Sequence, residues 1–293
     1  MTGVQTCALP ISSNFHWSAL DSSLTSAFLH LMSLPTINHI DLSYIKKFPL
    51  SSLTLSVNLL QLDILCLTCF KYFDHEEDNF FKTVQSEMMP KIREFHTWDS
   101  YQLTKNLLDV KGQDGRPVFN FMDLRRLSIS FFYYEDKRNI QCLLETAKLL
   151  ERLHLEVDIG QSLVGVLSTS ARTLKVLDLT IRLYQYGLPP LAGLCEELEA
   201  MAGHNTLEVL SFEVLLNSYR TFDSIGSTIQ EVGNILVKPG WSALRQVSFK
   251  LRVKDRGGCA ELTEALQSLP DKYLSRLSKL DVAFNYSAYP VYD

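Results

Sequence analysis

The sequence predicts an α/β solenoid in which parallel strands line a concave sheet and helices cover the convex side. Two observations predict this fold class. A short strand phrase recurs along the chain, with apolar residues at its positions 1, 4 and 6, as in LRRLSI at Leu124 and LKVLDL at Leu174. Stretches with helical apolar spacing separate the copies of the phrase. Self-similarity at such an interval is the signature of a repeat architecture, in which each unit buries its core against its neighbours.

The phrase has the pattern of the strand segment in a leucine-rich repeat. Its clear copies begin at Leu124, Leu150, Leu174, Leu207, Leu244 and Leu277, and weaker copies begin at Ile37, Leu59 and Ile92. The shortest interval, 22 residues, separates Ile37 from Leu59, and the longest, 37 residues, separates Leu207 from Leu244. About nine irregular repeats are therefore expected, and the long intervals leave room for a helix and a loop.

Four of the intervening stretches have apolar residues spaced three and four apart, which predicts helices. They lie within residues 140–148, 191–201, 225–236 and 262–269. Proline and glycine residues mark their ends, at Pro189-Pro190, Gly203, Pro239-Gly240 and Pro270. Right-handed helical crossovers would then join the strands into one parallel sheet.

Alternation along each strand places positions 1, 4 and 6 of the phrase in the core and positions 3, 5 and 7 on the concave face. Position 5 is occupied by Asp41, Asp63, His96, Ser128, His154, Asp178, Ser211, Ser248 and Asp281, and Glu156, Thr180, Gln246 and Lys279 are among the residues that flank it. This mixed polar face suits a protein partner, because charged groups give register and specificity. The residues expected to bind it are Trp98, Arg126, Arg152, His154, Asp178, Arg182, Glu213, Lys250, Arg252 and Asp281.

Three apolar residues, Leu65, Trp98 and Val176, also fall at outward positions. Tryptophan is a frequent anchor at protein interfaces. A one-residue slip in the weak copy at Ile92 would instead turn Trp98 into the core.

Composition narrows the function classes. The formal net charge of −5 disfavours nucleic acid as a partner. No run of about 18 apolar residues occurs, so no membrane span is expected. An odd number of scattered cysteines outside the first residues favours a reducing, intracellular compartment, cytoplasmic or nuclear.

No pattern predicts an enzyme, a cofactor or a metal. Cys66 and Cys69 form a C-x-x-C within an apolar run, where a strand would separate the two thiols, and no second pair accompanies them. His75 lies in an acidic stretch that lacks the spacing of a calcium loop. His154 and Asp178, with Ser128 or Ser211, invite a hydrolase interpretation, but nothing signals an oxyanion hole.

The first eleven residues, MTGVQTCALPI, resemble the translation of a short-read sequencing adapter. Residues 1–12 are therefore treated as a non-native leader. Residues 13–293 are expected to form a single repeat domain whose native amino end is truncated.

Three stretches resemble the leucine-rich repeat region of fungal F-box-like proteins of the mushroom lineage. They begin at Leu34 (LPTINHIDLSYIKKFPLSSLTL), Thr173 (TLKVLDLTI) and Pro239 (PGWSALRQVSFKL). The resemblance implies a ubiquitin ligase adaptor: an F-box binds the linker protein of a cullin ligase, and the repeats select the substrate. Residues 13–32 hold only one short helical pattern, too little for an F-box. Two alternatives stay open: an F-box that lies upstream of this sequence, or a protein of this kind that carries none.

The expected function is therefore non-enzymatic protein recognition as the substrate-binding region of such an adaptor. The alternatives are a leucine-rich repeat scaffold or sensor unrelated to ubiquitin and, more remotely, a hydrolase.

Overall fold

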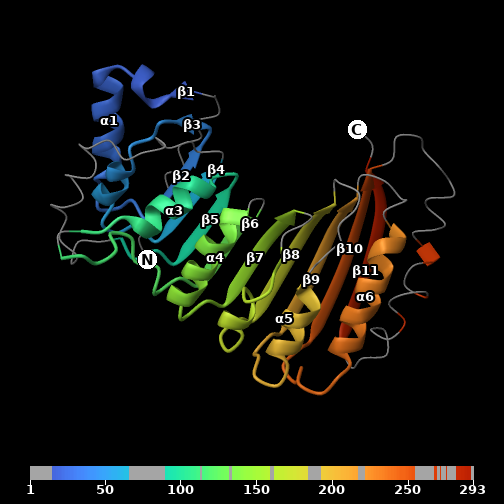
Figure 1. The fold of residues 1–293 in the computed structure, drawn as a ribbon. Helices are drawn as coiled ribbons and strands as arrows, with labels where there is room; N and C mark the ends of the chain where they lie inside the picture. The colour runs from blue at the N-terminus through green and yellow to red at the C-terminus, as the bar shows by residue number, and fades with distance from the viewer. Residues whose placement is uncertain are drawn as a thin grey trace, which may run out of the picture. The chain divides into compact units, whose positions relative to one another are not determined.

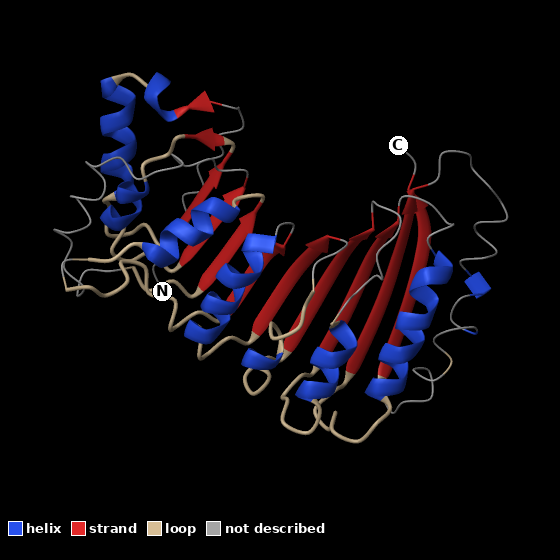
Figure 2. Ribbon diagram, viewed as in Figure 1, coloured by secondary structure: helices blue, strands red, loops and turns tan. Residues whose placement is uncertain are grey.

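The computed structural model is an α/β protein with a nine-stranded parallel sheet (Figures 1 and 2). It describes residues 15–65, 90–112, 114–131, 134–158, 162–183, 193–216, 222–254, 267–268, 271, 275 and 282–291. The chain divides into two compact units. Unit 1 comprises residues 1–130 and 146–149, and unit 2 comprises residues 131–145 and 150–293.

Unit 1 holds four neighbouring strands of the sheet in the order β6-β5-β4-β2, with β2 at the edge. These strands are β2 (His39–Ser43), β4 (Gln61–Leu65), β5 (Glu94–Trp98) and β6 (Arg126–Phe131), whose last residue belongs to unit 2. A separate pair is formed by β1 (Phe15–His16) and β3 (Ile45–Lys46). The helical elements of unit 1 are η1 (Trp17–Ala19), α1 (Ser22–Met32), η2 (Leu50–Leu55) and α3 (Tyr101–Asp109).

Local chemistry explains how α1 begins and where it packs. The side chain of Asp21 accepts a hydrogen bond of 2.8 Å from the backbone N–H of Leu24, a helix-capping contact. Phe28 on α1 meets Trp17 and Phe48 edge to face, with ring centroids 5.2 Å from Trp17 and 6.4 Å from Phe48. This aromatic cluster fixes the helix against the start of the sheet.

Unit 2 holds the strands in the order β11-β10-β9-β8-β7. They are β7 (Arg152–Asp158), β8 (Val176–Leu183), β9 (Val209–Leu216), β10 (Gln246–Lys254) and β11 (Ala283–Val291). Its helices are α4 (Tyr134–Thr146, with its last residue in unit 1), η4 (Ser168–Ser170), α5 (Leu194–Met201) and α6 (Phe222–Leu236). The pair α5 and α6 lies over one face of the strands (Figure 2).

The predicted repeat register holds for eight of the nine phrases. Each of these strands begins at position 3 of its phrase, and position 3 pairs with position 3 of the neighbouring strand within each unit. The same hydrogen-bond pattern recurs. One carbonyl at position 2 accepts two backbone N–H groups from the next repeat, as Glu151 does from Lys175 and Val176. Each repeat of the sequence phrase therefore corresponds to a repeat of the same backbone hydrogen bonds.

The core follows the predicted positions. In these eight phrases the side chains at positions 1, 4 and 6 are all at most 7% exposed. The exception in chemistry is Thr97 at position 6 of β5, a buried hydroxyl that makes no hydrogen bond. Its neighbours at the same position are apolar, so the stripe is otherwise a continuous apolar layer.

Three of the four predicted helices correspond to α4, α5 and α6. Gly203, the predicted end signal of α5, follows the helix with a φ of +85°. Asn205 Nδ2 donates to the carbonyls of Met201 (3.0 Å) and Gly240 (2.8 Å). The fourth stretch, residues 262–269, lies outside the described residues except for its last turn at 267–268.

The position of the last strand is a correction. The phrase LSKLDV predicts a strand that starts at position 3, Lys279, but β11 starts at Ala283, which pairs with Gln246. Val282, the last residue of the phrase, forms a bend outside the strand. Exposure alternates along residues 283–289, with Phe284, Tyr286 and Ala288 less exposed than their neighbours. All nine residues of β11 pair in register with β10.

Candidate functional site

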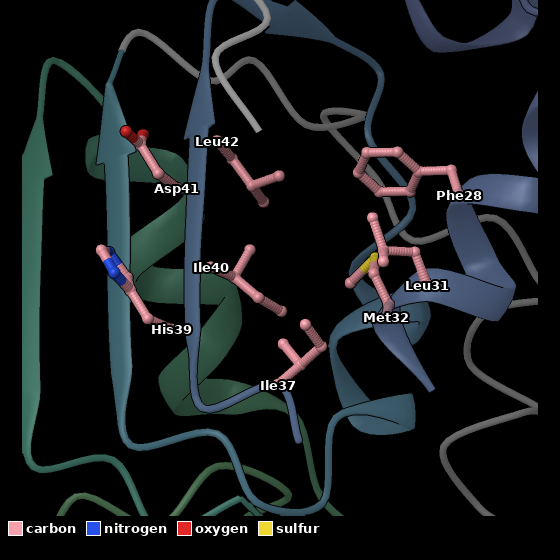
Figure 3. A pocket seen from close by; sticks show the side chains of 8 residues that line it. All are labelled: Phe28, Leu31, Met32, Ile37, His39, Ile40, Asp41 and Leu42. Carbon is pink, nitrogen blue, oxygen red and sulfur yellow. The ribbon is translucent and has the colours of Figure 1, made fainter. Parts of the chain in front are cut away.

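The candidate site is the sheet face that carries positions 3, 5, 7 and 9 of each strand, here called the polar face. Most of its described side chains are half-buried and keep part of their surface exposed. Figure 3 shows the alternation at β2: His39 and Asp41 point to one side of the strand, and Ile40 and Leu42 point to the other, toward α1. The polar face is described separately for the two units.

In unit 1 the polar face centres on the carboxylate of Asp63. A hydrogen bond of 2.7 Å joins His39 Nε2 to Asp63 Oδ2, and Gln61 Nε2 donates to the same oxygen at 3.0 Å. His96 Nε2 lies 3.9 Å from the other oxygen. Asp41 pairs in register with Asp63 from the neighbouring strand. Three side chains, of His39, Gln61 and His96, thus lie around the Asp63 carboxylate. His39 was not among the residues predicted for this face, because it lies at position 3 of a weak phrase.

Trp98 lies on the polar face, as the register of the phrase predicts, and is half-buried rather than part of the core. It pairs in register with Leu65 of β4, so two apolar side chains lie together at position 7. Arg126 stands at the exposed end of the same face and donates to Glu94 across 3.3 Å. An exposed pair of this kind contributes about 0.2–1 kcal/mol.

In unit 2 the row at position 5 contains His154, Asp178 and Ser211 on consecutive strands. The predicted neighbours are therefore paired in register, with Asp178 between the imidazole and the hydroxyl. A Ser-His-Asp triad needs the histidine in the middle, as the base that takes the proton of the serine. With Ser211 as the nucleophile, the row has the wrong order for that chemistry. Ser128, the other serine considered, belongs to unit 1 and is buried. Arg152 and Val176, also singled out from the sequence, begin the row at position 3.

An ion pair joins β7 to β8 farther along the same face. Arg182 Nε and Nη2 both contact Glu156 Oε1, and the Glu156 side chain is only 5% exposed. Glu156, Thr180 and Ser128 are predicted from the sequence to be exposed, and this prediction is wrong: all three are buried. The guanidinium of Arg182 lies against the Glu156 carboxylate.

A second charge cluster joins β9, β10 and β11. Glu213 Oε1 lies 3.0 Å from Lys250 Nζ and 2.6 Å from Arg252 Nε. The contact with Arg252 is an ion pair without the alignment of a hydrogen bond. Lys250 Nζ also lies 5.6 Å from the ring centroid of Tyr289.

These contacts shift two ionisation equilibria in opposite directions. The contact with Tyr289, followed by the ion pair with Glu213, raises the pKa of Lys250. The hydrogen bond from Lys250 lowers the pKa of the Tyr289 phenol. Tyr289 was not predicted for this face, because the last strand was expected to begin at Lys279, four residues before the observed start at Ala283. Asp281 and Lys279, which it assigned to this face, lie outside the described residues.

A pocket lies between α1 and β2 in unit 1 (Figure 3). Its lining is mainly apolar and comprises Phe28, Leu31, Met32, Ile37, His39, Ile40, Asp41 and Leu42. Ile37, which precedes β2, and the β2 residues Ile40 and Leu42 are each at most 7% exposed, so the pocket is a gap in the core next to an edge strand.

Among the described residues, no three His, Cys, Asp or Glu side chains are arranged to hold a metal ion. Cys66, Cys69 and His75, considered above as ligands, lie outside these residues. No helix in the described part of the chain is long and apolar enough to cross a membrane.

Comparison of the sequence with known protein families and with curated proteins finds no match. The class that the fold defines is an α/β protein with a parallel sheet of nine strands.

Proposed function

We propose that this chain is the substrate-binding leucine-rich repeat region of an F-box-type ubiquitin ligase adaptor, a non-enzymatic protein that binds another protein through its polar face. The observation that carries the proposal is the in-register arrangement of charged and polar side chains on this face in each unit. The repeat interpretation is supported by eight phrases that share one strand register and one pattern of carbonyl acceptance.

The chemistry of the polar face favours recognition over catalysis. Its acids and bases are largely paired with each other, as in Asp63 with His39 and Glu156 with Arg182. Such pairs form a fixed pattern of charge, which steers and aligns a protein partner. An apolar anchor accompanies the charges in unit 1, where Trp98 and Leu65 are adjacent.

The proposal is tested by comparing the wild-type chain with a variant of the polar face. The bait is expressed with a tag in its source cells, and partners are quantified by cross-linking and mass spectrometry. In the test variant, Arg152→Glu and Asp178→Lys reverse two charges on the polar face. In the control, Lys238→Glu and Glu199→Lys reverse an exposed ion pair between α5 and the turn after α6.

We expect a partner whose cross-links map to the polar face and whose yield falls at least about tenfold in the test variant and not in the control. The ubiquitin assignment further requires that depletion of the cullin-ligase linker protein raises the abundance of that partner. Unchanged abundance would favour the scaffold or sensor alternative. Cross-links confined to the helical side would contradict recognition through the polar face.

A further inference from the structure

The carboxyl-end half of the polar face in unit 2 has a layered charge distribution. Its residues come from positions 7 and 9 of consecutive strands: Glu156, Arg182, Glu213, Lys250, Arg252 and Tyr289. The two carboxylates are the deeper groups, with side chains 5% and 26% exposed for Glu156 and Glu213. The cations are the outer groups, with 35%, 39% and 37% for Arg182, Lys250 and Arg252.

This layering leaves the cations as the more exposed charged groups among these side chains. The two carboxylates are partly covered by the cations that they pair with. Asp158, at position 9 of β7, pairs in register with Arg182, so acids and cations at positions 7 and 9 are equal in number. The outer cations are the groups of this set that a negatively charged ligand would meet.

The cluster also contains an aromatic ring, which can make an apolar contact with a peptide. Tyr289 on β11 is 37% exposed and lies beside the Lys250 ammonium. An aromatic ring of this type offers a rigid apolar surface with a polar tip. Arg252 pairs in register with Tyr289, so guanidinium and phenol are presented side by side along one row.

We propose that Arg182, Lys250, Arg252 and Tyr289 form a binding site for an acidic peptide segment of a partner protein. This inference rests on the proposed function and names the chemistry of what the polar face would bind. Carboxylates of the segment pair with the outer cations, and its apolar side chains pack on the ring of Tyr289. Glu213 then acts as an internal competitor, since it already engages both Lys250 and Arg252.

Because Glu213 competes for the two cations, a variant that removes its charge is expected to bind the peptide more tightly. The probe is a fluorescein-labelled peptide of about ten residues, about six of them Glu, and its counterpart carries Gln in place of Glu. Fluorescence anisotropy measures the Kd of the purified chain for both peptides. Replacing Lys250 and Arg252 together by Gln is expected to weaken binding at least about tenfold, and Glu213→Gln is expected to strengthen it about threefold.

Two controls separate this site from a general charge effect. Lys238→Gln removes one exposed cation elsewhere in unit 2, at the pair with Glu199, and should leave the Kd unchanged. Raising the salt from about 0.1 M to about 1 M shortens the screening length from about 10 Å to about 3 Å and should weaken binding. Circular dichroism and thermal melting verify that each variant is folded.

Several results would overturn the inference: no binding of the Glu peptide, equal binding of the Gln peptide, an equal effect of Lys238→Gln, or weaker binding by Glu213→Gln. Equal binding of a single-stranded RNA of matched charge would also overturn it, as it would identify a site for polyanions in general. These failures are distinct from failure of the proposed function. A partner that cross-links to the polar face through a segment without acids would contradict only the acidic site.

Discussion

The buried carboxylate of Glu197 accepts a hydrogen bond of 2.7 Å from the backbone N–H of Leu167. The same carboxylate accepts from the N–H groups of Ser168, at 2.8 Å, and Gly165. Glu197 lies in the first turn of α5 and is 3% exposed. Two of its donors, Gly165 and Leu167, precede η4, and the third, Ser168, is the first residue of η4. A single acid therefore satisfies the backbone of a turn about thirty residues away in the sequence and ties it to the next repeat.

Replacing Glu197 by Gln should destabilise the protein although the two side chains have nearly the same shape. The amide has one acceptor oxygen instead of two, and its NH₂ group would face backbone donors in a buried site. We expect the free energy of unfolding to fall by about 2 kcal/mol, measured by urea denaturation. Glu199→Gln, two residues farther along the same helix, removes an exposed carboxylate and should change it by less than about 0.5 kcal/mol. Equal losses in both variants would contradict a specific role for Glu197.

Gly193, which precedes α5, should not tolerate a side chain. Its φ of +82° is unfavourable for other residues, and an added Cβ would lie 2.5 Å from Val164 Cγ2. Gly193→Ala is expected to cost about 2–4 kcal/mol, from the backbone conformation and from the steric overlap together. Gly203 has a similar φ of +85° with open space around it, so Gly203→Ala isolates the backbone cost of about 1–2 kcal/mol. Thermal unfolding of both variants measures the difference, and equal costs would contradict the steric part.

The strand positions could be predicted from the sequence because the apolar residues at positions 1, 4 and 6 of the phrase mark which side chains are buried. Leu174, Leu177 and Leu179 are each at most 1% exposed, as an inward set at that spacing requires. The phrase that begins at Leu277 predicted the wrong register, because Ala283 and not Lys279 pairs with Gln246. Spacing alone does not determine where a strand pairs, since the full length of β10 also contributes to the choice.

The polar face could be predicted as a set of positions but not as a set of contacts. The alternation of the strand placed Glu156 on that face correctly, whereas its burial depends on Arg182, a residue of the following repeat. Similarly, Glu197 has the pattern of an exposed helix-start acid, and only the folded turn before η4 shows that it is buried. Contacts between repeats depend on the length and conformation of individual side chains, and the spacing of the repeats does not predict these.

Removing Arg182 should destabilise the protein more than removing an ordinary surface cation. Arg182→Gln leaves the carboxylate of Glu156, 5% exposed, without its ion pair, and we expect a cost of about 2–3 kcal/mol in urea denaturation. The double variant with Glu156→Gln should recover part of that loss, because the buried charge is removed as well. Lys175→Gln, at an exposed pair 3.5 Å from Glu151, serves as the control and should cost about 0.5 kcal/mol or less. A double variant no more stable than Arg182→Gln would show that the two side chains are not coupled.

The thiols of Cys195 and Cys142 should differ in reactivity. Burial, followed by the charge and hydrogen bond of Glu231, raises the pKa of Cys195 from 9.0 to about 12. Since the thiolate is the nucleophile, iodoacetamide at about pH 8.5 should alkylate the exposed Cys142 at least about tenfold faster, as followed by peptide mass spectrometry. Glu231→Gln should accelerate alkylation of Cys195 and leave the alkylation rate of Cys142 unchanged. Equal alkylation rates for the two thiols in the folded protein would contradict this assignment.

The raised pKa of Cys195 also affects stability. Between pH 9.0 and about 12 the thiol loses a proton in the unfolded protein but retains it in the folded protein. The free energy of unfolding should therefore fall as the pH rises through this window.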